Sequence, residues 1–430
     1  MRQVSKIFLS IAFLVCAGLV ACGDDSSSSV LEAPEEEISS SSVSEESSSS
    51  RENVSSSSEE SSSSSVGSSE SDVPEEDPLI RTSVVEDTFE IFTFGSVNFD
   101  IAADSFLTKF DYGDFVTVMV AGYDTLDVPV VPGYGYVFPG EFLLLVSSGV
   151  NYITLGANYG EMAEIIGLGR DLEFPIEVVI QMKERGGYLD HLENLSSLSM
   201  SFYVEAYPDL TVEQFANFRM VHTTGMGEGK LYRSSSPVDP SIGRNTYADS
   251  LAEVAGVKTF VNLADNEEYA NTYTGFAESY YATQNVVYLD VLPGFANTPF
   301  KAGLVKGLRF MIEHEGPYLA HCTYGMDRTG YTIAVLEALM GATAEEIRAD
   351  YVTTHKNFYS FAEGGHVDLT PKQVSLIQAI IVRLMRNAYK VEGVDISDFD
   401  NVDLAAATEK YLLSLGMEQS EIDALKNCLK

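Results

Sequence analysis

The chain has 430 residues, of which 45% are hydrophobic and 11% aromatic, so it is long and apolar enough for roughly two or three folded domains. Its 26 basic and 64 acidic residues give a formal net charge of −38. This charge excludes nucleic acid as a partner, because binding to a phosphate backbone needs basic patches, and it disfavours direct binding to an anionic membrane surface.

The N-terminus has the pattern of an export signal. Arg2 and Lys6 precede an apolar run, residues 7–20, that is too short to span a bilayer. The run leads into Ala21-Cys22, with a leucine three positions before the cysteine, and this ending resembles the lipobox of bacterial lipoproteins. The resemblance implies removal of residues 1–21, a lipid on the Cys22 sulfur, and an extracytoplasmic protein in the bacterial cell envelope that meets the membrane through this anchor alone.

Residues 22–77 are a low-complexity segment of serine runs interrupted by pairs of glutamates. From residue 23 onward the segment has sixteen carboxylates and a single basic residue, Arg51, and it is almost free of apolar side chains. Such a composition cannot offset the entropy of ordering, so it predicts a disordered, self-repelling tether. A plain spacer and a sorting signal are both compatible with this pattern.

Residues 78–215 are predicted to form a small all-β accessory domain with a bridging segment toward its end. Short β-branched and aromatic runs alternate there with turn-prone stretches, which is typical of an antiparallel sandwich or barrel. The runs that read as strands are residues 89–94, 116–120, 142–146 and, in the bridging segment, 176–182. The pattern does not identify a ligand for this domain.

Residues 216–430 have the pattern of an α/β domain, in which a central sheet is flanked by helices. The predicted strands are residues 258–263, 285–289 and 317–320. Asp265 is expected to cap the helix that follows the first of these strands, with Glu268 reaching back to complete a capping box. The predicted helices are residues 331–340, 344–351 and 371–389, followed by two short ones that begin near Asp403 and Ser420.

The segment that points to chemistry follows the last predicted strand and reads His321-Cys322-Thr323-Tyr324-Gly325-Met326-Asp327-Arg328-Thr329-Gly330. A loop between a strand and a helix can turn successive backbone N–H groups toward a phosphate-sized anion, and Gly325 and Gly330 give the backbone the freedom that this needs. The helix dipole and Arg328 both favour a nucleophilic thiolate at Cys322. The Arg328 guanidinium can also bind two phosphate oxygens, so the residues suit phosphoryl transfer through a cysteinyl-phosphate.

This loop resembles the signature loop of the cysteine-dependent tyrosine phosphatases, and more narrowly that of their bacterial family related to dual-specificity enzymes. The resemblance spans about residues 217–430 and implies a catalytic domain that needs neither metal nor cofactor. It implies that Cys322 is the nucleophile, that Thr329 steadies the leaving thiolate, and that His321 orients the loop and helps to activate the thiol. The phosphate-binding residues that it implies are Thr323, Tyr324, Gly325, Met326, Asp327 and Arg328.

The resemblance offers two candidates for the general acid that protonates the leaving group. Asp327 lies inside the loop, where the bacterial family keeps its acid, and it could equally cap the first turn of the helix. Asp290 ends a predicted strand thirty-two residues before Cys322, which matches the spacing in dual-specificity enzymes. We favour Asp327 and keep Asp290 as the alternative.

Four further positions bear on the substrate. Met326 stands where relatives carry a lysine, and this absence disfavours highly phosphorylated inositol rings, as does the overall acidity. Arg233 is either a second anion contact or a buried structural residue paired with a carboxylate. His355 and Lys356 either face the pocket or form a surface pair.

The leading function is therefore a phosphomonoester hydrolase acting on phosphotyrosine or mixed phosphoprotein substrates outside the cytoplasm. One alternative is a scavenger of inositol phosphates or other small phosphomonoesters, and another is a tethered binding protein whose phosphatase domain is vestigial. Cys322 and Cys428 would be the two cysteines of the anchored chain that carry no lipid, and a bridge between them is conceivable. The sequence gives no indication of oligomeric state.

Overall fold

The computed structural model describes residues 77–85, 96–123, 125–160, 162–168, 173–196, 203–359, 361–362, 365–366 and 368–430. The predicted export signal, Cys22, almost all of the predicted tether and the predicted strand at residues 89–94 lie outside the described residues. None of the described helices is both long and apolar enough to cross a bilayer.

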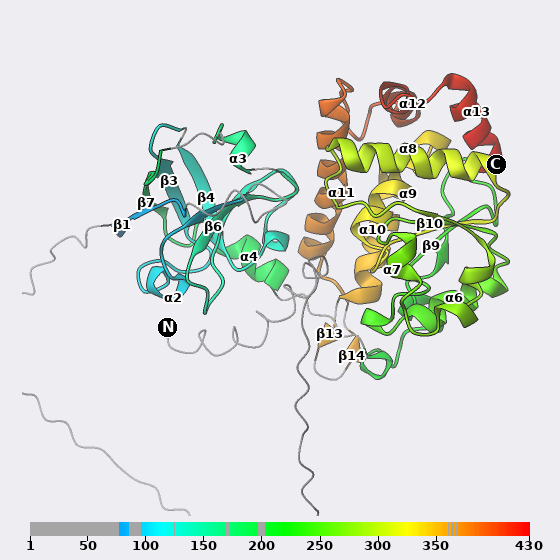
Figure 1. Cartoon of the computed structure of the whole chain (residues 1–430), viewed down its shortest axis with the longest axis horizontal. Coiled ribbons are helices and arrows are strands. Elements are labelled where there is room, and N and C mark those ends of the chain that lie inside the picture. Colours follow the sequence, from blue (N-terminus) through cyan, green and yellow to red (C-terminus); the bar gives the residue numbers. More distant parts are fainter. Residues whose placement is uncertain are drawn as a thin grey trace, which may run out of the picture. The chain divides into compact units, whose positions relative to one another are not determined.

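The accessory domain is built on one seven-stranded sheet (Figure 1). Its strands are β1 (Leu79–Ser83), β2 (Val97–Phe99), β3 (Phe115–Val120), β4 (Leu126–Val131), β5 (Phe142–Leu145), β6 (Ile153–Ala157) and β7 (Glu177–Glu184). Its helical segments are α2 (Ala103–Phe106), η4 (Tyr134–Tyr136), α3 (Met162–Ile165) and α4 (Leu189–Ser196). The stretch that the sequence presents as a bridge contributes β7, which lies inside the sheet between β1 and β3.

The sheet closes toward a barrel. Its strand order is β1-β7-β3-β4-β5-β6-β2, and every neighbouring pair is antiparallel except β4 with β5. Val84, next to β1, forms an antiparallel bridge with Phe99 of β2, so the first and last strands of the order meet. In β3 the side chains of Val116, Val118 and Val120 are buried in the core and alternate with partly exposed ones, as the two-residue period of a strand requires. The prediction of strands at residues 116–120 and 142–146 is confirmed.

The α/β domain, residues 216–430, contains a five-stranded sheet in the order β11-β10-β12-β9-β8. The strands are β8 (Arg219–Met220), β9 (Leu231–Ser234), β10 (Thr259–Asn262), β11 (Asn285–Tyr288) and β12 (Tyr318–His321). β9, β12, β10 and β11 run parallel, and the register pairs His321 with both Ser234 and Asn262. The carboxyl ends of these strands therefore meet at one edge, which is where α/β sheets place their sites.

Helices cover both faces of this sheet, as the sequence predicts (Figure 1). Phe260 packs with Ala248 of α6 on one face, whereas the next residue, Val261, packs with Leu304 of α8 on the other. The helices are α5 (Val212–Phe215), α6 (Asn245–Val254), α7 (Glu267–Ala270), α8 (Thr298–Glu313), α9 (Asp327–Met340), α10 (Ala344–Phe358), α11 (Pro371–Val391), α12 (Leu404–Ser414) and α13 (Gln419–Cys428). The smaller elements are η5 (Val204–Ala206), η6 (Pro240–Ile242), η7 (Phe276–Glu278), η8 (Tyr281–Thr283), β13 (Phe361–Ala362) and β14 (Gly365–His366).

The structure corrects one predicted helix cap. Asn266, and not Asp265, is the N-cap of α7, because its side chain accepts a hydrogen bond from the Tyr269 N–H at 2.8 Å. The predicted start of a helix near Asp403 is confirmed, and Asp403 is its N-cap, since its carboxylate accepts from the Ala406 N–H at 2.9 Å. Because Asn266 takes the cap position, the Asp265 carboxylate is available for other contacts at the site.

Candidate active site

The predicted loop lies between the end of β12 and the start of α9. Cys322 follows the last residue of β12 and its side chain is buried, with 3% of its surface exposed. Asp327 and Arg328 are the first two residues of α9. We call residues 322–328 the phosphate loop. It stands at the edge where the parallel strands end, with the N-terminus of a fourteen-residue helix at its back.

The carbonyl groups of the phosphate loop are held from outside. Asn217 Nδ2 donates to the Tyr324 carbonyl oxygen at 3.2 Å, and Arg233 Nη2 donates to the Gly325 carbonyl oxygen at 2.7 Å. The Ser236 N–H donates to the Thr323 carbonyl oxygen at 3.0 Å. Because the C=O and N–H groups of a planar trans peptide point in opposite directions, these contacts turn the N–H groups of the loop inward. This arrangement can hold a phosphate.

Two glycines are required by the space around the loop. Gly325 has a φ of 67°, and a Cβ atom there would lie 2.1 Å from the Ser234 carbonyl oxygen. A Cβ atom at Gly330 would lie 2.7 Å from the ring of Tyr351. The phosphate loop therefore packs against β9, and the first turn of α9 against α10, more closely than any residue type other than glycine would permit.

A buried ion-pair network braces the loop. Arg233 is completely buried and pairs with Asp350, and Arg219 Nε donates to the same carboxylate at 2.7 Å. Burial alone would raise the pKa of Asp350, but the two guanidinium groups hold it below its ordinary value. Arg233 also donates to the Gly325 carbonyl oxygen. It is therefore the buried structural residue paired with a carboxylate, which was one of the two roles expected for it, and not a second anion contact.

Arg328 and Thr329 both stand in the first turn of α9. Arg328 Nη1 donates to the Val291 carbonyl oxygen at 3.2 Å and approaches that of Leu263 at 3.4 Å, so its guanidinium lies between the segments that follow β11 and β10. The Thr329 side chain is fully buried, and its hydroxyl has no hydrogen-bond partner among the described residues.

His321 is buried at the end of β12 as a neutral ring. Its Nε2 atom lies 3.2 Å from the Tyr281 hydroxyl, which also accepts a hydrogen bond from Asn262 Nδ2. Burial lowers the pKa of His321 to about 3, so the ring is uncharged at neutral pH. Any effect of His321 on the cysteine must therefore come from orientation and hydrogen bonding rather than from a positive charge.

Asp327 occupies a largely apolar site beside tyrosines. The Tyr351 hydroxyl donates to its Oδ1 atom at 3.0 Å, and the Tyr159 hydroxyl lies close enough to the carboxylate to lower its pKa. Burial raises the pKa of Asp327 above its ordinary value, although the two hydroxyl groups and the charge of Arg328 act in the opposite direction. A carboxyl group with a raised pKa retains a proton that it can donate.

Asp290, the alternative acid, has a different environment. It is exposed, has a φ of 46°, and accepts a hydrogen bond from Asn266 Nδ2 at 3.1 Å. It follows β11, so it belongs to the same sheet edge as the phosphate loop. The structure thus brings both candidates to one end of the domain, where Asp327 is half-buried and Asp290 is exposed.

Sequence reasoning assigned Asp265 to a helix cap and to no role at the site. Its carboxylate accepts hydrogen bonds from Asn262 Nδ2 at 3.0 Å and from the Tyr273 hydroxyl at 2.9 Å, and Arg328 lies close enough to lower its pKa. Burial is the larger effect and raises the pKa of Asp265. An available signal was its position directly after a buried parallel strand.

The other residues that the sequence analysis singled out are Met326, His355 and Lys356. Met326 is 7% exposed and packs with Ile242 and Phe358, so its side chain turns away from solvent. His355 is buried between two tyrosine rings, and burial lowers its pKa to about 4, whereas Lys356 is exposed. The two residues therefore form neither a pocket-facing pair nor a surface pair.

Cys322 and Cys428 are both unbridged. The Cys428 thiol interacts with the side chain of Tyr318, which begins β12, whereas Cys322 follows the end of that strand. Tyr318 and Cys322 are four positions apart along an extended strand, roughly 13 Å, so the two thiols contact different ends of β12.

Comparisons with known proteins agree with the motif. A family model described as the tyrosine phosphatase family matches residues 210–430, just over half of the chain. None of the curated proteins compared with the chain matches it.

Three solved structures are similar to parts of the chain. P. aeruginosa TpbA in complex with pTyr is 18% identical, with a TM-score of 0.25, over 41% of this chain and 94% of that one. The core catalytic domain of the S. cerevisiae PP-IP phosphatase SIW14, in complex with citrate, is 20% identical, with a TM-score of 0.24, over 41% and 93%. An uncharacterized conserved protein from Thermotoga maritima is 23% identical, with a TM-score of 0.20, over 24% of this chain and 35% of that one, so the chain spans about a third of that protein. Similarities of this size identify neither substrate nor partner.

Proposed function

Because the chain belongs to the tyrosine phosphatase family, we propose that it hydrolyses phosphomonoesters on proteins, phosphotyrosine foremost, through a cysteinyl-phosphate intermediate. The observation that carries this proposal is the phosphate loop itself. Its carbonyl groups are tied outward, Cys322 stands buried at its start, and Arg328 stands at its end on the first turn of α9.

In the first step the Cys322 thiolate attacks phosphorus, so that an S–P bond forms while the bond from phosphorus to the phenolic oxygen breaks. The inward N–H groups of the loop and the Arg328 guanidinium hold the three remaining phosphoryl oxygens and stabilise the charge that they share. A carboxylic acid gives its proton to the departing oxygen, and neutral tyrosine leaves.

In the second step a water molecule attacks phosphorus and gives its proton to the same carboxylate. The S–P bond breaks, and inorganic phosphate and the Cys322 thiolate are released, which restores the starting state. The buried Thr329 hydroxyl supports a role in steadying this thiolate, because it has no other partner among the described residues to which it could donate.

We assign the general acid to Asp327. Its half-buried position and its raised pKa support this choice, since Asp290 is exposed to solvent. The test compares the pH dependence of turnover for Asp327→Asn and Asp290→Asn. The assignment predicts that only Asp327→Asn loses the limb of the rate profile that belongs to the acid, and a loss confined to Asp290→Asn would transfer the role.

The charges near the loop support a phosphoprotein substrate over a highly phosphorylated small molecule. Asp265 lies near Arg328, and Asp239 lies near both Asp265 and Tyr324 of the loop. Met326 supplies no compensating cation, because it is apolar and buried. Additional phosphates beside the reacting one would meet these carboxylates and be repelled.

The site of action is proposed from the sequence alone. The export signal and the Cys22 lipobox favour a lipid-anchored protein outside the cytoplasm. In cell fractionation the chain should accompany the membranes, and Cys22→Ser should release it from them. Recovery of both proteins from the soluble cytoplasm would contradict the proposal.

The activity is tested by phosphate release from the full chain in the presence of a chelator. The substrates are a phosphotyrosine peptide, a phosphoserine peptide, a phosphoinositide and phytate. Turnover should disappear in Cys322→Ser and persist in Cys428→Ser, a matched removal of the other free thiol. Phytate as the best substrate would favour a scavenger, and absence of turnover in the folded, reduced protein would favour a tethered binding protein.

A further inference from the structure

The accessory domain reaches the phosphate loop through Tyr159, in the turn after β6, where Ala157 and Gly160 form a bridge. Tyr159 has a φ of 57°, an uncommon conformation for a residue with a large side chain. Among the described residues other than glycine, positive φ values occur only at Tyr159, Asn217 and Asp290. Asn217 holds carbonyl groups of the phosphate loop and Asp290 is the alternative acid, so strained backbone gathers around this site.

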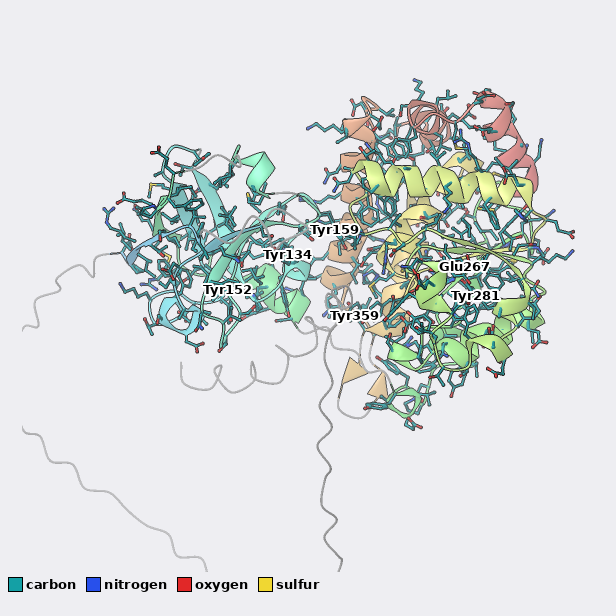
Figure 2. All side chains as sticks on the ribbon, in the orientation of Figure 1. Tyr134, Tyr152, Tyr159, Glu267, Tyr281 and Tyr359 are labelled. Atoms are coloured by element: carbon teal, nitrogen blue, oxygen red, sulfur yellow. The ribbon has the colours of Figure 1, made fainter. Side chains whose placement is uncertain are left out.

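The Tyr159 side chain packs into the catalytic domain. Its ring meets the edge of Phe295 with 5.2 Å between ring centroids, and it joins the hydrophobic core that includes α8 and α9. Its hydroxyl lies close enough to the Asp327 carboxylate for each group to shift the pKa of the other. Tyr159 is labelled in Figure 2 together with Tyr359, which follows α10.

The turn that carries Tyr159 is braced against α11. The Gly140 N–H donates to the Asn158 carbonyl oxygen at 2.7 Å, which ties the neighbouring segment directly to this turn. Asn387 Nδ2 of α11 donates to the Pro139 carbonyl oxygen at 3.2 Å. A Cβ atom at Gly140 would lie 2.5 Å from Asn387 Nδ2, so the approach to α11 is close. Residues 78–430 accordingly belong to one compact unit.

We propose that Tyr159 is a positioning residue of the catalytic site, whose hydroxyl orients the Asp327 carboxyl group for proton transfer to the leaving oxygen. The accessory domain then completes the active site. With Tyr351 donating to Oδ1 from α10, hydroxyl groups from two domains hold one carboxylate. This inference rests on the proposed function, because orienting Asp327 affects catalysis only if Asp327 is the acid and base of the reaction.

The direction of the effect follows from the groups that face Asp327. These are Arg328 on α9, Tyr351 on α10, Tyr359 after α10, and Tyr159 from the accessory domain. A hydroxyl that donates to a carboxylate favours its charged form. Removing the Tyr159 hydroxyl should therefore raise the pKa of Asp327 further, and the limb of the kcat profile that falls as Asp327 loses its proton should move to higher pH.

The experiment measures kcat against pH on a phosphotyrosine peptide with the full chain. Tyr159→Phe keeps the ring and its contact with Phe295 but removes the hydroxyl. It should move the basic limb upward by about one pH unit and lower the acidic plateau by about threefold to tenfold. Tyr152→Phe, a control at a 37% exposed tyrosine ahead of the same strand, should change neither. Thermal unfolding of Tyr159→Phe should match that of the unchanged chain.

The possible results separate the inference from the function on which it rests. A Tyr159→Phe profile that superimposes on the original would overturn the positioning role while leaving the phosphatase intact. A rise of kcat/KM at every pH would show instead that Tyr159 obstructs the site. If the original chain shows no turnover, the proposed function fails. In that case a carbon-13 titration of the Asp327 carboxyl group still tests the contact, which predicts a higher pKa in Tyr159→Phe and is contradicted by an unchanged one.

Discussion

Asp350→Asn should destabilise the protein strongly, because it removes the counterion of two guanidinium groups. The Arg233 side chain is completely buried and the Asp350 side chain is 11% exposed, so solvent cannot replace the lost charge. Breaking a buried ion pair by removing one partner costs about 3–5 kcal/mol, which for a domain of this size corresponds to a fall in Tm of about 6–20 °C. The lower value, about 3 kcal/mol, allows for Glu337, a buried carboxyl group beside the same arginines. Glu337 can ionise when Asp350 is lost and so replace part of the missing negative charge.

The assay is thermal and urea unfolding of the full chain, with Asp400→Asn as the matched control. Asp400 also pairs with an arginine, Arg348, but its side chain is 61% exposed, so its loss should cost about 0–1 kcal/mol. Activity of Asp350→Asn should fall as well, since Arg233 would no longer be fixed against the Gly325 carbonyl group. Equal losses of stability in the two variants would refute the claim that this network supports the loop.

Three further outcomes are expected. Gly325→Ala should lower kcat/KM by more than about 100-fold, because its Cβ atom would lie 2.1 Å from the Ser234 carbonyl oxygen; steady-state kinetics close to the original would contradict the close packing. Lowering the pH from 7 to 5 should reduce the free energy of unfolding by about 2 kcal/mol through His321 alone, because the folded ring has a pKa of about 3 whereas the unfolded chain takes up a proton near pH 6.5. Urea unfolding should show a weaker pH dependence in His321→Gln, and an unchanged one would rule this out. Hydrolysis of phytate should be slower than that of a phosphotyrosine peptide and should improve relative to it in Asp239→Asn; the reverse ranking would remove the charge argument.

The elements that the sequence predicts well are those whose pattern is local. Alternating or continuous apolar runs locate β3, β5, β10, β11 and β12 to within a residue or two. The phosphate loop is equally evident, because its chemistry lies in ten consecutive residues. Helix α9 begins at Asp327, four residues earlier than predicted, since residues of the loop also build the first helical turn.

Helix α8 was not predicted, and its glycines explain why. Gly303 and Gly307 lower its helical propensity, but both positions are dictated by packing. A Cβ atom at Gly303 would lie 2.5 Å from a Val291 side-chain carbon, and one at Gly307 would lie 3.1 Å from Leu289 and Val261. The tertiary contact that demands these glycines is invisible in the local sequence.

The contact of Tyr159 with Asp327 could not be predicted for a related reason. It joins two domains whose sequences carry no shared pattern, and nothing distinguishes this tyrosine from the other aromatic residues of the accessory domain. The role of Arg233 was open for the same reason, since its partner Asp350 lies far along the chain on α10. Sequence patterns predict the proposed nucleophile and the loop, whereas the side chains that hold the loop in place are found only in the folded chain.

The central claim is that Cys322 carries the phosphoryl group during turnover. The most direct test is to quench the full chain with acid during hydrolysis of a phosphotyrosine peptide and to map the modified residue by mass spectrometry, using Asp327→Asn to slow breakdown of the intermediate. The account predicts a single phosphoryl group on the peptide that contains Cys322, absent in Cys322→Ser and present in Cys428→Ser. Steady turnover with the phosphoryl group on another residue, or with none on the enzyme, would contradict it.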